Sequence, residues 1–336
     1  MKPKTLSERN GNGHHSEMGT MTESPSTGAE NLINSAFPPE GANTELEEVE
    51  GFKLLNQQEA DREVTNVAAV EAAEVSDTFE ESGVEIPTLE SQPKEAFFAS
   101  YTELMPRNEN ISEVIIGTDD RVRINTTTVF PWRAVCALRI TAKDGTRWIG
   151  TGWLVSPRTV ITAGHCVYMH DHGGWARNIE VIPGMNDAAR PYGSGTSSNL
   201  RSVQGWTQSK NRDFDYGAII LPANSRLGDR TGYFGYAVRN DAFLLSSTLN
   251  LSGYPGDKGG NQQWYMARRP RSVSSRVIYY DIDTMGGQSG APVWIKIGTT
   301  RYCVGIHTNG ASSGNSATRI ATPVFNNIMA WKALGM

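Results

Sequence analysis

The chain has 336 residues and a formal net charge of −5 at neutral pH, so it is long enough for one or two domains with an ample core. No apolar run is long enough to cross a membrane, and the polar stretch after the basic start lacks the apolar centre of a signal peptide, so we expect no membrane partner. Its three cysteines, Cys136, Cys166 and Cys303, allow at most one bridge and exclude a disulfide-rich scaffold.

The net charge conceals two oppositely charged parts. Residues 1–113 carry 23 acidic and 7 basic side chains, a net charge of −16. Residues 114–336 carry 13 acidic and 24 basic side chains, a net charge of +11. This complementarity favours docking of one part on the other, although each exposed ion pair contributes little and salt weakens it.

The acidic part divides further by composition. Residues 1 to about 60 are polar and poor in aromatic residues, so they cannot bury enough surface to offset the entropy of ordering, and we predict disorder. The Ala-, Val- and Glu-rich stretch 61–83 predicts a weak helix. An apolar cluster then precedes Pro106 and is the expected docking point on the basic part: Phe97, Phe98, Tyr101 and Leu104.

From about Val114 the pattern changes to short apolar runs separated by Gly, Pro, Asn and Asp. Such runs, without long helices between them, predict an all-β barrel or sandwich. We expect strands at 134–140, 148–155, 159–162, 216–221, 248–252, 278–281, 291–297 and 301–306.

Only the end of the chain predicts a helix, at residues 322–334. Thr322 is the expected N-cap, and Pro323 occupies the first helical position. The predicted apolar face consists of Val324, Phe325, Ile328, Met329 and Trp331.

Two short motifs indicate the chemistry. His165 follows a predicted buried strand in Thr-Ala-Gly-His-Cys, and Ser289 lies 124 residues later in the turn Gly-Gly-Gln-Ser-Gly. Serine becomes a nucleophile when an imidazole takes its proton, and the imidazole needs a carboxylate that fixes its tautomer. Asp215, next to the apolar run 217–221, is the preferred carboxylate because that position predicts burial; Asp213 is the alternative. The order His, Asp, Ser is that of chymotrypsin-like proteases.

With these motifs the chain resembles the bacterial glutamyl endopeptidases, a V8-like branch of the chymotrypsin-fold serine proteases that cuts after Glu. The resemblance runs from about Ile115 to Trp331 and rests on residues 116–121, 233–236, 252–258, 286–290 and 307–310. It implies two packed six-stranded β-barrels, at about 114–230 and 231–320, before the C-terminal helix. It also implies a secreted, monomeric serine endopeptidase that cleaves polypeptides through an acyl-enzyme, without a metal or cofactor.

The resemblance assigns a role to each matching residue. The catalytic roles are His165 as general base, Asp215 as its orienting carboxylate, Ser289 as nucleophile, and the amides of Gly287 and Ser289 as oxyanion hole. Thr284 and His307 would hold the Glu carboxylate of the substrate. An imidazole N–H and a hydroxyl can both donate hydrogen bonds to a carboxylate, so the assignment is chemically sound.

Composition bears on the same specificity. Of 22 Glu residues, 21 lie in 1–113 and only Glu180 lies in 114–336, where 12 Asp residues remain. An enzyme that cuts after Glu benefits from lacking Glu itself. Against this, Asp283 lies six residues before Ser289, where trypsin-like enzymes place the carboxylate that binds Arg or Lys. A trypsin-like preference through Asp283 is therefore the alternative.

The resemblance also implies activation by cleavage. Residues 1–113 would be a propeptide that acts as an intramolecular inhibitor or chaperone. The change of composition predicts cleavage after Glu113, with Val114 as the new N-terminus near the pocket. Gln288 stands where trypsin-like enzymes have the Asp that pairs with the new amine, so that ion pair is unavailable.

Two alternatives stay open. Gly150 stands where chymotrypsin-like enzymes place the cysteine that bridges to the one after the catalytic His, so a bridge between Cys136 and Cys166 is undecided. The other alternative is a catalytically inactive relative whose basic surface binds an acidic partner. Scattered Arg residues without interleaved aromatic residues predict no nucleic-acid partner.

Overall fold

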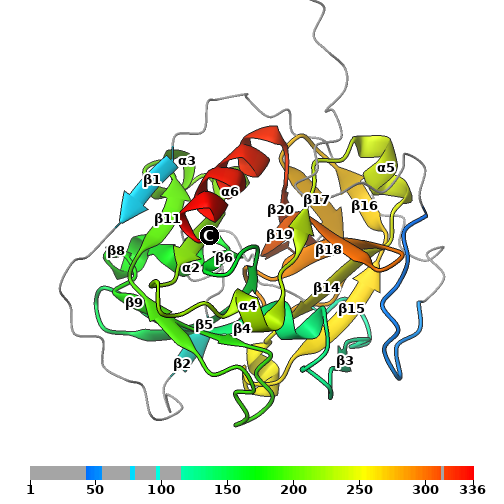
Figure 1. The fold of residues 1–336 in the computed structure, drawn as a ribbon. Helices are drawn as coiled ribbons and strands as arrows, with labels where there is room; N and C mark the ends of the chain where they lie inside the picture. Colours follow the sequence, from blue (N-terminus) through cyan, green and yellow to red (C-terminus); the bar gives the residue numbers. More distant parts are fainter. Residues whose placement is uncertain (1–42, 55–75, 80–95, 99–114, 312–313) are drawn as a thin grey trace, which may run out of the picture.

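The computed structural model describes residues 43–54, 76–79, 96–98, 115–311 and 314–336. Within these residues, two curled sheets of nine strands each lie side by side, with a C-terminal helix and short helices at their edges (Figure 1). The predicted all-β, chymotrypsin-like class with a C-terminal helix is confirmed. The sheets have more than the expected six strands because short strands extend them.

The first sheet is built mainly from residues 135–220. In spatial order its strands are β1 (Ser76–Phe79), β11 (Leu200–Val203), β12 (Gly217–Ile220), β6 (Thr159–Thr162), β5 (Arg147–Leu154), β4 (Val135–Thr141), β9 (Asn178–Pro183) and β10 (Gly195–Ser197), and β5 also pairs in parallel with β2 (Ala96–Phe98). Leu138, Val160 and Ile219 belong to its fully buried core, so apolar burial holds these strands together.

The second sheet is built mainly from residues 249–319. In spatial order its strands are β16 (Pro270–Val273), β17 (Val277–Tyr280), β20 (Gly314–Arg319), β19 (Thr300–Ala311), β18 (Pro292–Ile297), β14 (Leu249–Gly253), β15 (Trp264–Arg268) and β3 (Val122–Arg123), and β19 also pairs in parallel with β13 (Gly235–Tyr236). A separate hairpin joins β7 (Tyr168–Met169) to β8 (Gly174–Trp175). β3 precedes the first sheet in sequence yet pairs with the second, so the chain crosses between them.

Aromatic rings fill the contact between the two sheets. The Trp132 and Trp294 rings are 5.9 Å apart between centroids, Trp294 and Phe234 5.5 Å, and Phe234 and Trp153 6.0 Å. All four side chains belong to one buried cluster that includes residues of both sheets. Such pairs contribute roughly 0.5–1.5 kcal/mol each beyond their burial, so this cluster fixes how the sheets meet.

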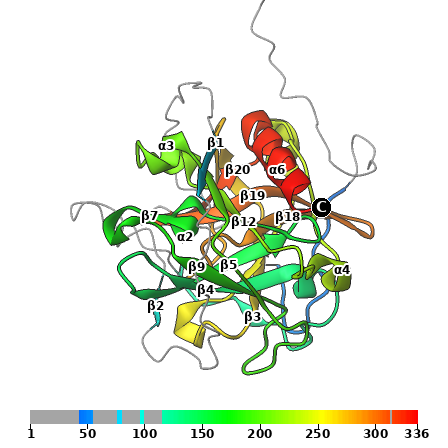
Figure 2. The same ribbon diagram turned by 60° about the vertical axis from the view of Figure 1, so that its left-hand side comes forward.

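The C-terminal helix α6 (Thr322–Leu334) confirms the predicted range, but its N-cap is Ala321, without a side-chain cap. Thr322 is the first helical residue, so its predicted capping role is wrong. The helix follows the second sheet in the chain and lies beside β12 of the first sheet (Figure 2). The Trp331 ring lies 5.6 Å from that of Tyr216, and Asn327 Nδ2 donates to the Tyr216 hydroxyl at 2.8 Å. Met329 is 52% exposed, so it lies off the predicted apolar face.

Short helices that the sequence did not predict connect the strands: α2 (Gly164–Val167), α3 (Gln204–Thr207), α4 (Gly228–Thr231) and α5 (Asp241–Ser246). None exceeds six residues, and each lies between strands. Their shortness explains why no helical periodicity was visible in the sequence.

Three stretches of the acidic part are described, and two differ from expectation. Residues 43–54 pack against the second sheet, so the predicted disorder is wrong for that stretch. Residues 76–79 form β1, which pairs with β11, so the helix predicted over 61–83 is wrong there. β2 pairs with β5 at the expected docking point; Tyr101 and Leu104 lie outside the described residues.

Candidate active site

His165 and Asp215 meet because their strands are neighbours. β6 ends at Thr162, which pairs with Gly217 at the start of β12, so the turn after β6 lies beside the turn before β12. His165 Nδ1 lies 2.7 Å from Asp215 Oδ2, and the His165 backbone N–H donates to Asp215 Oδ1 at 2.8 Å. Both side chains are fully buried, so this carboxylate fixes both the imidazole and the backbone that carries it.

Asp213 takes a different position. It lies on a 3-10 turn (Arg212–Phe214), half-buried, and its backbone N–H donates to Asn211 Oδ1. Asp213 and Asp215 therefore do not lie on one extended strand, where their side chains would point to the same face. Asp215, at the end of this turn, is the carboxylate beside His165.

The surroundings of His165 set its titration. Burial disfavours the charged imidazolium, but the negative charge of Asp215, its hydrogen bond and the neighbouring Cys166 together raise the pKa of His165 well above its ordinary value of 6.5. An imidazole beside a buried carboxylate accepts a proton more readily than one in water. This is the electrostatic arrangement of a general base that must carry positive charge in a transition state.

Ser289 is brought to the same place by backbone contacts with β5. Its carbonyl accepts from the Thr151 N–H at 2.9 Å and from the Cys166 thiol, next to His165, at 3.7 Å. Gly290 follows with φ +86°, and a Cβ there would lie 2.1 Å from Thr162 Oγ1. Only glycine allows this close approach of the serine turn to the end of β6.

The turn before Ser289 also requires glycine. Gly287 has φ +102°, and a Cβ there would lie 2.6 Å from the Tyr254 carbonyl. The Gln288 N–H donates to the Met285 carbonyl at 3.0 Å, which closes the turn. The glycine and the closing hydrogen bond therefore hold this loop in one compact backbone path.

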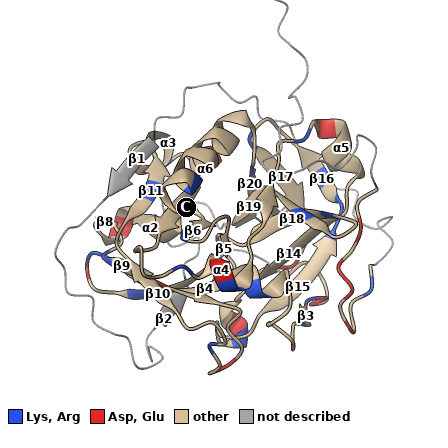
Figure 3. Cartoon of the chain, viewed as in Figure 1, with Lys and Arg blue, Asp and Glu red and all other residues tan. Residues whose placement is uncertain are grey.

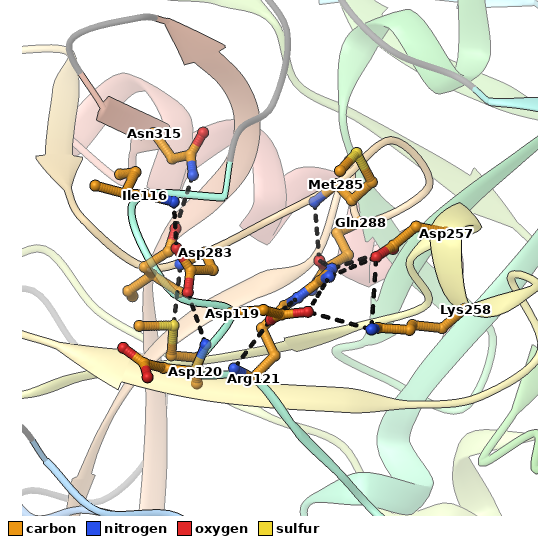
Figure 4. A network of polar contacts seen from close by, with 12 residues as sticks. Ile116, Asp119, Asp120, Arg121, Asp257, Lys258, Asp283, Met285, Gln288 and Asn315 are labelled. Atoms are coloured by element: carbon orange, nitrogen blue, oxygen red, sulfur yellow. Dashed lines mark hydrogen bonds and ion pairs between the residues drawn. The ribbon is translucent and has the colours of Figure 1, made fainter.

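A guanidinium braces this loop from the side (Figure 4). The Arg121 side chain is fully buried and donates to Asp119 Oδ1 at 2.8 Å, to Asp257 Oδ2 at 2.6 Å and to Gln288 Oε1 at 3.3 Å. Hydrogen bonding and charge from Arg121 lower the pKa of Asp119 to about 2. Sequence reasoning gave Arg121 no role. Its only signal was its place in the matched segment 116–121.

Asp283 anchors the start of the described basic part. Its two carboxylate oxygens accept the backbone N–H groups of Ile116 at 2.7 Å and Asp120 at 3.0 Å (Figure 4). The residue is 1% exposed. Because both oxygens hold this segment, they are already used where a trypsin-like site would offer them to Arg or Lys. Glu113 and Val114 lie outside the described residues.

His307 lies directly beside the serine turn. Its carbonyl accepts from the Gly290 N–H at 2.6 Å and its N–H donates to the Ala291 carbonyl at 2.9 Å. Its Nδ1 lies 2.7 Å from the Tyr280 hydroxyl. Burial, followed by the nearby charge of His165, lowers the pKa of His307 to about 3, so the ring is neutral at physiological pH.

Thr284 is fully buried next to Asp283 in sequence. Among the described residues, its hydroxyl has no hydrogen-bond partner. A buried hydroxyl of this kind is costly unless a ligand satisfies it. Tyr280, which orients His307, was missed by sequence reasoning because it appeared only as an aromatic residue of a predicted strand.

The cysteines are free and buried, with no bridge between Cys136 and Cys166. A Cβ at Gly150 would lie 3.0 Å from Cys166 Sγ. Within the described part of the chain, no group of three or more His, Cys, Asp and Glu could hold a metal ion. Among those residues, too, no helix is long and apolar enough to span a membrane.

Comparisons with known proteins match the same part of the chain. The family model described as Trypsin matches residues 115–332. "Extracellular metalloprotease" of Bacillus subtilis (strain 168) is 41% identical over 239 residues, 70% of this chain and 75% of that one. "Glutamyl endopeptidase" of Bacillus licheniformis is 40% identical over 226 residues, 65% of this chain and 69% of that one. Among solved structures, a Glu endopeptidase in complex with MPD has a TM-score of 0.58 and 29% identity, and covers 66% of this chain and 100% of that one.

Proposed function

Because this chain belongs to the trypsin family and is a serine endopeptidase of the chymotrypsin fold, we propose that it cleaves polypeptides after Glu with His165, Asp215 and Ser289 as its catalytic triad. The observation that carries the preference is a pair of buried polar side chains, Thr284 and His307, the second of which contacts the serine turn. The Thr284 hydroxyl has no partner among the described residues, and the neutral His307 ring is held by Tyr280. A substrate carboxylate has acceptor oxygens for both a hydroxyl and an imidazole N–H.

The proposed reaction runs through an acyl-enzyme. Ser289 Oγ attacks the scissile carbonyl while His165 Nε2 takes its proton, and Asp215 stabilises the imidazolium. The amides of Gly287 and Ser289 bind the oxyanion of the tetrahedral intermediate. His165 returns the proton to the leaving amine. Water then attacks the ester while His165 takes its proton, and His165 passes that proton to Ser289 Oγ as the acid product leaves. The 2.7 Å contact between His165 and Asp215 supports these roles.

The names of the relatives differ in protease class. The Bacillus subtilis relative is named a metalloprotease, and the Bacillus licheniformis relative is named a glutamyl endopeptidase. The serine class of this chain rests on its family match, and the proposed roles rest on the His165–Asp215 pair. We also propose that the chain is secreted and monomeric. Secretion is supported by the Bacillus subtilis relative, whose name calls it extracellular.

The surroundings of Glu180 support a preference for Glu. It is the only Glu in residues 114–336, and it is 5% exposed. Its carboxylate pairs with Arg190 and accepts from the Ser194 hydroxyl at 2.7 Å. The one Glu of the proposed catalytic domain is thereby protected from the cleavage that the domain would perform.

Replacing His307 by Ala tests the pocket. If Nδ1 accepts from Tyr280, Nε2 carries the proton that a substrate carboxylate needs, and loss of this charge-assisted hydrogen bond costs on the order of 1.5–3 kcal/mol. We expect kcat/KM to fall at least about tenfold for peptides with Glu before the scissile bond, and to change little for matched Gln peptides. His172→Ala, at a partly exposed histidine, is the control. Equal losses for both peptides, or faster cleavage after Arg, would contradict the assignment.

We further propose that residues 1–113 are a propeptide and residues 114–336 the catalytic domain, divided at about residue 230 into its two sheets. The Ile116 N–H bound to Asp283 supports this, because Asp283 precedes Thr284. An amine at Val114 would be two residues away, within about 7 Å of chain. It would add positive charge beside a pocket whose imidazole is neutral.

Glu113→Gln tests self-processing, because the precursor would lose the side chain that its own pocket recognises. We expect maturation to the Val114 N-terminus to slow by at least about tenfold, as for a Gln peptide. N-terminal sequencing and intact mass over a time course measure this. Glu109→Gln is the matched control and should mature at the normal rate. Unchanged processing of Glu113→Gln would mean that another protease or another bond is used.

A further inference from the structure

Residues 44–47 insert between two strands of the second sheet, far from the proposed catalytic site (Figure 1). β14 and β18 pair only at Asn250–Trp294 and Leu251–Val293. Just beyond the last pair, the Glu45 N–H donates to the Lys296 carbonyl at 2.9 Å, in an antiparallel bridge. The segment therefore lies where the backbone groups of β14 and β18 no longer form hydrogen bonds with each other.

The side chain of Asn250 forms hydrogen bonds with the backbone of this segment. Its Nδ2 donates to the Glu45 carbonyl at 3.1 Å, and its Oδ1 accepts from the Glu47 N–H at 3.0 Å. Asn250 is fully buried, and its Oδ1 also accepts from the Tyr265 hydroxyl at 2.7 Å. A fixed amide that bonds peptide groups on both sides of one residue is a device for holding an extended peptide.

The side chain of Glu47 enters the protein. It is 5% exposed, and its Oε1 accepts from Trp294 Nε1 at 2.9 Å and Arg301 Nε at 2.8 Å, while Oε2 accepts from Arg301 Nη2 at 2.7 Å. The guanidinium is thus bidentate, the strongest geometry for recognising a carboxylate. Trp294 also belongs to the aromatic cluster between the sheets, so the recognition site rests on a rigid support.

Charge and apolar contacts extend the site on both sides of Glu47. Lys296 Nζ lies 3.3 Å from Glu45 Oε2 and donates to the Leu46 carbonyl at 3.1 Å. The Phe52 ring packs edge-on against Tyr265, with centroids 5.0 Å apart. In Figure 3 the ribbon of this segment is red at its acidic residues, and that of the neighbouring β18 is blue at Lys296.

We propose that Asn250, Trp294, Lys296 and Arg301 form a second peptide-binding site, specific for a Glu side chain, which keeps residues 43–54 bound after the chain is cut downstream. The occupant is this segment of the chain itself. The site makes no use of Ser289, so it is independent of the proposed function. An enzyme with this site would carry its N-terminal fragment as a non-covalent subunit.

The test uses the full chain with Ser289→Ala, which removes self-cleavage, and a recognition sequence for a site-specific protease inserted between residues 55 and 75. This cut separates residues 43–54 from β1 and β2, so their pairing with the first sheet cannot hold the fragment. After cutting, size-exclusion chromatography at micromolar concentration should show the N-terminal fragment eluting with the rest of the chain. Separation of the two pieces would overturn the proposal.

The glutamate is tested by a matched pair. Glu47→Gln should raise the dissociation constant of a labelled fragment at least about tenfold, because it removes the charge on Arg301's partner. Glu48→Gln, at the exposed neighbour, should leave it unchanged. Synthetic peptides of residues 43–54 with the same changes can compete with the labelled fragment for the chain that has been cut between residues 55 and 75. Their relative affinities test the role of Glu47 even if a variant chain fails to fold. Equal competition by the Glu47→Gln and Glu48→Gln peptides would refute recognition of Glu47.

Discussion

Ser289→Ala is expected to remove essentially all peptide hydrolysis, with kcat lower by a factor on the order of 10⁶. The substitution removes the hydroxyl that would form the acyl-enzyme and leaves the Ser289 amide of the proposed oxyanion hole in place. The fold should survive, because the contacts that hold this residue are made by its backbone carbonyl with Thr151 and Cys166. Residual activity from the oxyanion hole and binding alone would remain far below that of the wild type.

A fluorophosphonate probe and a peptide assay measure this result together. The wild type should be labelled at Ser289, and Ser289→Ala should be neither labelled nor active. Ser246→Ala, at an exposed serine of α5, should behave as the wild type. Substantial activity in purified Ser289→Ala would contradict the assignment of Ser289 as nucleophile. A wild type that the probe does not label would favour the alternative of a catalytically inactive relative that binds an acidic partner.

Asp215→Asn is expected to lower kcat by a factor on the order of 10⁴. The carboxylate accepts from both the ring and the backbone of His165. An amide whose oxygen accepts from the backbone N–H turns its NH2 group toward the ring and favours the wrong tautomer of His165. Asp213→Asn is the matched control, because Asp213 lies on the preceding turn, where its backbone N–H donates to Asn211 Oδ1, and the variant should retain most activity. A larger loss in Asp213→Asn than in Asp215→Asn would reverse the assignment.

The pH profile supplies a second measurement of the same pair. The base must be neutral to accept a proton, so kcat/KM should rise as pH rises through the pKa of His165. Since Asp215 raises that pKa, half-maximal activity should lie above pH 6.5 in the wild type. In Asp215→Asn the charge is gone while burial remains, so the midpoint of the small residual activity should move to lower pH. A midpoint that stays in place would show that the carboxylate does not control the base.

The sequence predicted the strands where apolar residues run together, and missed those where buried polar residues interrupt them. β20 contains Asn315 and Thr318, both buried; Asn315 Nδ2 donates to the Ile282 carbonyl at 2.8 Å and Thr318 Oγ1 to the Asp215 carbonyl at 3.2 Å. Their partners come from distant parts of the chain, so no local pattern reveals them. β9 was not predicted either, although Ile179 and Val181 alternate there with the charged Glu180.

The same distinction applies to the candidate site. The motifs located the proposed triad residues because glycines and short polar residues mark sharp turns. Composition averaged over residues 1–60 could not reveal residues 43–54, whose order depends on a guanidinium at Arg301, more than 200 positions away in sequence. The bracing role of Arg121 likewise required knowing that Asp257 and Gln288 converge on it.

The position of Arg121 in the chain has a consequence for latency. In trypsin-like enzymes the amine created by cleavage orders the nucleophile loop, but here an internal guanidinium touches Gln288 while the chain is still uncut. Under the proposed function, the turn that carries Ser289 would therefore be braced before cleavage, and removal of residues 1–113 would change what can enter and bind rather than whether the serine is ready. We would then expect the precursor to be a slow enzyme that starts its own conversion without a first activated molecule.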